Sequence, residues 1–211
     1  MGAEVKTLIL ASAPETEYDY VRQLAQQAEY IICADGGTRH AAACGIRPDL
    51  VIGDFDSGAR PDGVEVIALR PEKDDSDLMC CTKEAIRRGA DDITYACASG
   101  GRIDHFLCNL SLLEYLHSCG VHGMLCDSRN RVTFHPGGAV WYQADASYRY
   151  VGIIPLDAEL IGVTLRGLKY PLTDATVLRA QMITISNEPA APEYMISVRE
   201  GRSLVIESKD K

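Results

Sequence analysis

The sequence predicts an α/β fold in two domains: an N-terminal parallel β-sheet with helices on its faces, then a smaller C-terminal antiparallel β-sandwich. Two observations lead to this prediction. Over the first 130 residues, short runs rich in β-branched residues alternate with helical patterns, as they do in βαβ units. From about Val132 the pattern changes to short β-like runs separated by Gly, Pro, Asn and Asp, and no long helix is visible. We therefore expect a Rossmann-like α/β domain at residues 1–130 and a β-sandwich domain at residues 131–211.

The individual elements follow from the same patterns. In the first domain, strand-like runs span residues 6–13, 29–34, 48–55, 64–70 and 92–99, and helical patterns span residues 18–27, 38–44, 77–88 and 104–119. Gly45 and Gly89 fall where left-handed helix caps usually lie, and Gly120 ends the last helix. In the second domain, β-like runs span residues 131–143, 148–155, 159–172, 182–188, 194–200 and 203–209.

The composition limits the kinds of partner. The net charge of −9 repels nucleic acid and anionic membranes, and no basic patch offsets it. The first apolar run is too short to span a membrane and too strand-like for a signal peptide, so we expect a soluble, cytoplasmic protein. The eight cysteines lie in apolar runs without a CxxC pair, which favours free, buried thiols.

Candidate functional residues follow the predicted strands. Ligands of open parallel sheets bind beyond the carboxyl ends of the strands, because the βα loops and helix N-termini converge there. Four successive strands end in polar residues or glycines, namely Asp35-Gly36-Gly37, Asp54-Phe55-Asp56-Ser57, residues 71–77, and Gly100 to His105.

Asp54 and Asp56 are two residues apart, so in an extended segment both carboxylates point to one side. Such a pair repels itself unless a cation joins it, and carboxylates together with water and phosphate oxygens are the usual ligands of Mg²⁺. The simpler reading is that both residues only shape a turn. We expect the pair to hold a metal ion.

A second acidic cluster precedes the predicted helix at residues 77–88. Ser76 suits the N-cap position and Asp77 complements the helix dipole. Those roles do not account for Asp74 and Asp75, which add acids to a loop that should neighbour Asp54. The density of charge favours a metal site here.

Gly100 and Gly101 lie between a strand and a helix, where glycine lets the backbone approach a phosphate closely. Arg102 and His105 add donors that suit phosphate oxygens, although Asp104 can simply cap the helix and His105 can be structural. The GxxxxGK[ST] and GxGxxG motifs are absent. The residues therefore predict phosphoryl transfer from a nucleotide to a small molecule, with magnesium bound by aspartates.

Five strings, taken in order, closely resemble the thiamine pyrophosphokinase family. They are ADGG (34–37), GDFDS (53–57), KDDSD (73–77), GGRIDH (100–105) with Asn109, and ISNE (185–188). The resemblance runs from Ile32 to Asp210 and includes GLKYPLTDAT (167–176) and SVREGRSLVIESKD (197–210). It implies transfer of the β,γ-diphosphoryl group of ATP to the hydroxyl of thiamine, with AMP as the other product. It also implies Mg²⁺ as cofactor and a homodimer with active sites between subunits.

The resemblance also implies roles for individual residues. Asp54, Asp56 and Asp77 would hold Mg²⁺. The catalytic set would be Asp54, Asp56, Asp74, Asp77, Arg102 and Asp104, and the nucleotide-binding set would be Asp35, Gly36, Gly37, Ser57, Gly100, Gly101, Arg102 and His105. Ser186 and Asn187 would meet thiamine from the partner chain.

Two departures from the family pattern are Ser76, where Thr is common, and residues 189–192, where an aromatic residue is common. The residue that stacks on thiamine is left open between Trp141, Tyr194 and another. Two rival functions remain: the same fold acting on a different alcohol, such as a hydroxymethylpterin, and a sensor that binds without turnover. The SNE string favours thiamine, and the intact acidic residues together with Arg102 favour catalysis over sensing.

Overall fold

The computed structural model describes residues 5–54, 63–70, 72 and 74–210, which form two compact units. Unit 1 spans Met1–Ser128 and unit 2 spans Arg129–Lys211, so the division falls two residues before the expected domain boundary at residue 130. In the part of the chain that the structure describes, no helix is long and apolar enough to cross a membrane.

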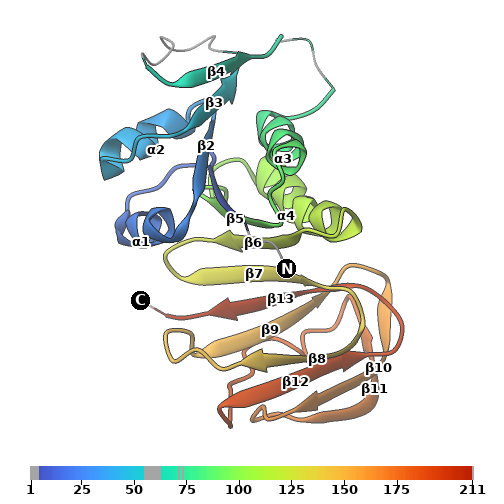
Figure 1. Cartoon of the computed structure of the whole chain (residues 1–211). Coiled ribbons are helices and arrows are strands. Elements are labelled where there is room, and N and C mark those ends of the chain that lie inside the picture. The colour runs from blue at the N-terminus through green and yellow to red at the C-terminus, as the bar shows by residue number, and fades with distance from the viewer. Residues whose placement is uncertain (1–4, 55–62, 71, 73, 211) are drawn as a thin grey trace. The chain divides into compact units, whose positions relative to one another are not determined.

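Unit 1 is a parallel sheet with helices on both faces (Figure 1). Its elements are β1 (Lys6–Leu10), α1 (Asp19–Gln27), β2 (Tyr30–Ala34), α2 (Gly37–Cys44), β3 (Leu50–Gly53), β4 (Glu65–Ala68), α3 (Asp77–Arg87), β5 (Asp92–Ala96), α4 (Ile103–Ser118) and β6 (His122–Cys126). The strand order is β4-β3-β2-β1-β5-β6, and every pairing is parallel. The order reverses between β1 and β5, which makes that position the topological switch point where open α/β sheets bind ligands.

The core of unit 1 explains why these segments form these elements. Side chains alternate along the strands, so Leu8 and Leu10 of β1 point to the same face and pack with Val21 of α1 and Ala41 of α2. Helices α1 and α2 cover this face, and α3 and α4 cover the other (Figure 1). Helix α2 ends at Gly45, whose φ of 68° is the left-handed cap conformation that glycine adopts at little cost.

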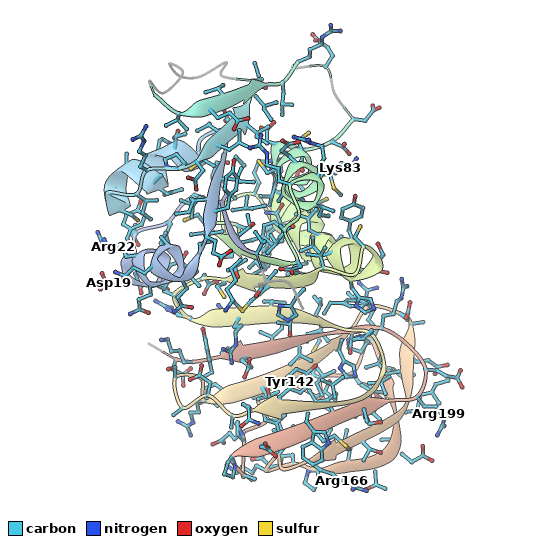
Figure 2. All side chains as sticks on the ribbon, viewed as in Figure 1. Asp19, Arg22, Lys83, Tyr142, Arg166 and Arg199 are labelled. Carbon is cyan, nitrogen blue, oxygen red and sulfur yellow. The ribbon has the colours of Figure 1, made fainter. Side chains whose placement is uncertain are left out.

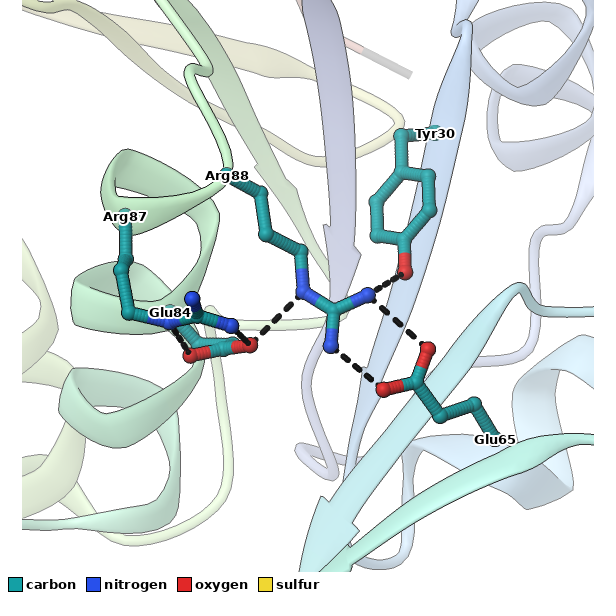
Figure 3. A network of polar contacts seen from close by, with 5 residues as sticks. All are labelled: Tyr30, Glu65, Glu84, Arg87 and Arg88. Atoms are coloured by element: carbon teal, nitrogen blue, oxygen red, sulfur yellow. Dashed lines mark hydrogen bonds and ion pairs between the residues drawn. The ribbon is translucent and has the colours of Figure 1, made fainter.

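Helix α3 is fixed at both ends. At its start, Ser76 Oγ accepts a hydrogen bond from Met79 N at 3.2 Å, as a side-chain N-cap does. At its end, the Arg88 guanidinium donates to Tyr30 Oη at 2.6 Å and to both oxygens of Glu65, at 2.6 and 2.9 Å (Figure 3). These bonds join α3 to the first residues of β2 and β4.

Unit 2 is an antiparallel sandwich. Its strands are β7 (Asn130–His135), β8 (Gly138–Gln143), β9 (Tyr150–Pro155), β10 (Glu159–Arg166), β11 (Leu172–Leu178), β12 (Glu193–Val198) and β13 (Ser203–Ser208). In one layer β13 pairs with both β7 and β9, and in the other the order is β11-β10-β12-β8. Residues such as Ile153, Leu165 and Ile196 fill the space between the layers. Tyr142 is partly buried and packs against this core, whereas Arg166 and Arg199 are exposed (Figure 2).

The α/β class with a C-terminal sandwich is confirmed, but several expected elements are corrected. The run 131–143 forms two strands, because Pro136 and Gly137 turn the chain between them; Gly137 has a φ of 101°. Residues 182–188 form no strand and make only an isolated bridge, from Asn187 to Val151. Strands β6 and β11 were not expected. All eight cysteines are free; Cys108 and Cys119 are exposed rather than buried.

Candidate active site

A cavity of about 580 Å³ opens at the carboxyl ends of β1 and β5, at the switch point of the sheet in unit 1. The residues that follow β1 form one side of it, and Ala98, Gly100 and Gly101 after β5 form another. The first residues of α3 and α4 complete the lining with Asp77 and His105. The cavity therefore collects backbone amides, helix N-termini and charged side chains, the groups that bind a phosphorylated ligand.

The loop between β5 and α4 is held in a conformation that requires glycine. Gly100 and Gly101 have φ of 83° and 66°, and a Cβ on Gly101 would lie 2.9 Å from Pro14 Cδ. Asn109 of α4 donates from Nδ2 to Ala98 O at 2.9 Å, and this bond attaches the start of the loop to the helix. Glycine is thus needed for the shape of this loop, and its close approach to a phosphate stays a prediction.

Arg102 and Asp104 form an ion pair at the start of α4. Arg102 Nη2 lies 2.5 Å from Asp104 Oδ2, and both side chains are exposed. The Arg102 guanidinium, with the His105 backbone N–H as a lesser contributor, lowers the pKa of Asp104 to about 2. Arg102 and His105 line the cavity, whereas Asp104 does not, so in this structure Asp104 orients the arginine at the rim.

The acidic loop before α3 contributes unevenly to the cavity. Asp75, Ser76 and Asp77 line it, and Asp74 is exposed outside it. Asp75 Oδ2 accepts from Lys83 Nζ at 2.6 Å, an ion pair that ties the loop to the second turn of α3. Sequence reasoning placed Asp75 among the acids but gave it no role of its own.

Asp35 and Asp54 follow the neighbouring strands β2 and β3. Asp35 N donates to Ile52 O at 2.8 Å, and Asp35 has a φ of 40°, which is uncommon for a residue other than glycine. A Cβ on Gly53 would lie 3.0 Å from Asp35 Oδ1, so the glycine before Asp54 makes room for Asp35. Neither aspartate lines the cavity, and neither do Gly36 and Gly37 at the start of α2.

Only some of the predicted magnesium ligands are among the described residues. Asp56 and Ser57 lie outside the described residues. Within the described ranges, no group of three or more His, Cys, Asp or Glu side chains is arranged to hold a metal ion. Helix α3, which begins at Asp77, packs on β3, which ends just before Asp54, and the carboxylate oxygens of these two residues are of the kind that Mg²⁺ prefers. The chemistry of these donors fits magnesium, and its binding stays a prediction.

Ser186 and Asn187, the predicted thiamine residues, belong to unit 2. Asn187 is 4% exposed, and its side-chain amide forms two hydrogen bonds with the backbone of Tyr170. Oδ1 accepts from Tyr170 N at 2.9 Å, and Nδ2 donates to Tyr170 O at 2.8 Å. Ser186 is exposed and has a φ of 56°. The amide of Asn187 thus has a structural use, and Ser186 is the more accessible of the two.

The candidate aromatic residues differ in access. Tyr194 is fully buried, stacks on Tyr142 with ring centroids 5.3 Å apart, and donates to Glu207 Oε1 at 3.1 Å. Trp141 is 60% exposed and Tyr170 is 56% exposed. Tyr194 is therefore part of the core of unit 2, whereas Trp141 and Tyr170 are accessible to a ligand.

The wall formed by Ser12, Ala13 and Pro14 was missed from sequence, because these residues were assigned to the first strand or the loop after it. Strand β1 ends at Leu10 instead. Pro14 was the one local indication that the strand ends before this segment, since proline lacks the N–H that a central strand needs.

A parallel α/β unit with an anion-suited cavity at its switch point, followed by a separate antiparallel sandwich, is an architecture suited to a two-domain enzyme that transfers phosphoryl groups. Comparison with known proteins identifies which one. The family model described as the thiamin pyrophosphokinase catalytic domain matches residues 21–122, and that of the thiamin pyrophosphokinase vitamin B1 binding domain matches residues 141–202. The chain belongs to the thiamine pyrophosphokinase family.

Individual relatives agree over the full length. A thiamine pyrophosphokinase of Bacillus subtilis (strain 168) is 29% identical over 214 residues, covering 98% of this chain and all of the relative. The crystal structure of the Bacillus subtilis thiamine pyrophosphokinase has a TM-score of 0.88 at 28% identity, covering 98% of this chain and 100% of that one. A thiamin pyrophosphokinase family protein from Enterococcus faecalis has a TM-score of 0.84 at 30% identity, with the same coverage.

Proposed function

We propose that this enzyme transfers the β,γ-diphosphoryl group of ATP to the hydroxyl of thiamine, giving thiamine diphosphate and AMP. The proposal rests on one observation. The segment matched by the catalytic family model contains most of the residues that line the switch-point cavity, including Asp77, Arg102 and His105. The match of the second family model to unit 2 supports thiamine as the acceptor.

The reaction is an in-line displacement at the β-phosphorus. The hydroxyl oxygen of thiamine bonds to that phosphorus while the bond to the oxygen bridging the α- and β-phosphates breaks. AMP leaves with the bridging oxygen, and the hydroxyl proton passes to solvent. A loose transition state needs little early deprotonation, so no side chain is assigned as general base, and catalysis is mainly positioning and charge stabilisation.

The nucleotide contacts follow from the loops of unit 1. The backbone at Gly100 and Gly101 is free to approach the phosphates, and Arg102 and His105 at the start of α4 add donors. The remaining nucleotide-binding assignments are Asp35, Gly36, Gly37 and Ser57. Asp74 and Asp104 complete the catalytic set; the ion pair with Asp104 aims the Arg102 guanidinium.

Magnesium is the proposed cofactor, held by Asp54, Asp56 and Asp77. When bound, Mg²⁺ supplies positive charge that neutralises phosphate oxygens during transfer. Asp54 directly follows β3 and Asp77 begins α3. Together with Asp56 they would hold the ion, whose charge would offset the repulsion between these carboxylates and the nucleotide.

The thiamine assignments lie in unit 2. We place Ser186 and Asn187 beside thiamine, contributed across a homodimer by the partner chain. Tyr170 is the aromatic residue that best suits stacking on the thiamine ring. Tyr170 is exposed, and its backbone N–H and C=O are both bonded to the Asn187 amide, so its position next to Asn187 is fixed.

The test is to incubate the purified protein with ATP, Mg²⁺ and thiamine, and to follow products by mass-resolved chromatography. We expect AMP and thiamine diphosphate in equal amounts, and none of either with EDTA. ADP with thiamine monophosphate would mean that the wrong phosphorus was assigned. Thiamine binding without turnover would favour a sensor.

A matched pair of variants tests the metal assignment in the same assay. Asp54→Asn keeps the shape but removes a charge, so turnover should fall by roughly two or more orders of magnitude, as loss of a major electrostatic contributor does. Asp19→Asn removes an exposed charge from α1, on an ion pair with Arg22, and should leave turnover unchanged (Figure 2). Equal activity of the two variants would refute the role of Asp54.

A further inference from the structure

The residues that follow β1 form a wall of the cavity that the proposed chemistry does not yet use. Ser12, Ala13 and Pro14 line the cavity. Ala13 N donates to Cys97 O at 2.9 Å, so the wall runs beside the end of β5. Pro14 packs against Gly101, where no side chain would fit. A shift of this wall would therefore change the space at the phosphate-binding loop.

A tyrosine–histidine pair holds the outer end of this wall. Tyr18 Oη donates to the Glu15 backbone carbonyl at 3.1 Å and lies 3.1 Å from His40 Nδ1. The two rings are tilted at 45°, with centroids 5.8 Å apart. The hydrogen bonds of the Tyr18 hydroxyl therefore connect His40 of α2 to the loop at Glu15.

The histidine lies in the interior and beside the wall. His40 is 6% exposed, and burial lowers its pKa, while hydrogen bonding to the Ala13 backbone acts in the opposite direction. The ring therefore rests against a residue of the cavity lining. Glu15 is fixed a second time, because Tyr20 Oη donates to its Oε2 at 2.7 Å.

We propose that Tyr18 and His40 are positioning residues that fix Ser12, Ala13 and Pro14 as a rigid wall of the nucleotide pocket. This inference rests on the proposed function, since it assumes that the nucleotide occupies the cavity. Helices α1 and α2 are attached to the sheet independently, by apolar contacts of residues such as Val21 and Ala41. Loss of the Tyr18–His40 bond should thus loosen the loop more than the helices.

The test variant is Tyr18→Phe, which removes the hydroxyl and keeps the ring. We expect KM for ATP to rise about 3- to 10-fold, the usual consequence of losing one buried hydrogen bond. The kcat and the KM for thiamine should stay within about twofold, because the groups proposed to contact the reacting phosphorus are unchanged. The Kd for AMP, measured by calorimetry without thiamine, should rise with the KM for ATP.

Unit 2 offers a matched control. Tyr142 Oη lies 3.0 Å from His135 Nδ1, with the rings tilted at 38° and 6.3 Å apart, so Tyr142→Phe deletes the same group from a similar pair. It should lower thermal stability without changing the Kd for AMP. His40→Leu should reproduce the effect of Tyr18→Phe, and the double variant should add little, because both remove the bond between Tyr18 and His40.

The two proposals can fail separately. If the wild type makes thiamine diphosphate but Tyr18→Phe has the wild-type KM for ATP and Kd for AMP, the positioning role is wrong and the proposed function stands. If the wild type binds AMP but makes no product, the proposed function fails, and the Kd values of Tyr18→Phe and Tyr142→Phe still decide the positioning role. Equal Kd values, or no AMP binding by the wild type, overturn it.

Discussion

At the residue scale, unusual backbone conformations coincide with candidate site residues. Among the described residues, the non-glycine positions with positive φ are Asp35, Cys97, Asp174 and Ser186. Asp35 and Ser186 were selected from the sequence, and Cys97 directly follows β5, just before the glycine loop. Such conformations cost free energy and persist where the surrounding structure imposes them, often at functional sites. The sequence gives little warning of them, because Asp, Cys and Ser adopt negative φ in most contexts.

The proposed thiamine contact gives a prediction for one side chain. Tyr170→Ala should raise KM for thiamine about 3- to 10-fold, because an aromatic pair contributes roughly 0.5–1.5 kcal/mol beyond its buried area. KM for ATP should not change. Steady-state kinetics with each substrate varied in turn will measure both.

Trp141→Ala serves as the comparison, because Trp141 is similarly exposed but lies on β8, whereas the hydrogen bonds of the Asn187 side chain hold Tyr170. A larger increase in KM for thiamine in Trp141→Ala than in Tyr170→Ala would reverse the assignment.

At the element scale, long periodic segments were predicted well and short glycine-containing ones were not. The four helices of unit 1 begin and end within one residue of the expected limits, because caps such as Ser76 and Gly45 mark them. Strand β6 was missed. Its sequence HGMLC contains Gly123, where a Cβ would lie 2.7 Å from Leu116 Cδ1. Close packing of α4 thus favours at this position the residue that weakened the strand signal.

The same limit applies to the site. Asp77, Arg102 and His105 could be found because polar residues at strand ends are informative. The hydrogen bond from Tyr18 to His40 could not be found, because it joins residues 22 positions apart. The wall at Ser12 could not be found either, because it is placed by the bond from Ala13 N to Cys97 O, which is still farther along the chain. No local pattern specifies such a contact.

Helix α3 offers a prediction about one element. Arg88→Met should lower the free energy of unfolding by roughly 1–3 kcal/mol, because the hydrogen-bonded network of Arg88 with Tyr30, Glu65 and Glu84 loses its only shared donor (Figure 3). Urea denaturation followed by circular dichroism measures this.

Arg87→Met is the control. Arg87 is 69% exposed and bonds only to Glu84 within the network drawn, so its loss should be the smaller one. The network would have no special role if both variants were destabilised equally.

At the scale of the whole molecule, the two units share one design: each contains a buried histidine bonded to a tyrosine hydroxyl. His40 in unit 1 and His135 in unit 2 both have their pKa lowered from 6.5, chiefly by burial. Unfolding exposes the rings and restores the ordinary pKa. Between the lowered pKa and about 6.5, the unfolded chain then binds more protons than the folded one, so stability falls as the pH falls.

Unit 2 allows this to be measured by itself, because the chain has one tryptophan, Trp141, and it lies in β8. Urea unfolding followed by tryptophan fluorescence should give a lower free energy at pH 5.5 than at pH 7.5. The slope contributed by His135 should approach at most about 1.4 kcal/mol per pH unit. The carboxylates with strongly lowered pKa, such as Asp157 at about 2, titrate below this window. His135→Leu should therefore flatten the dependence even though it alters stability overall. A slope unchanged by that substitution would show that another group in unit 2 is responsible.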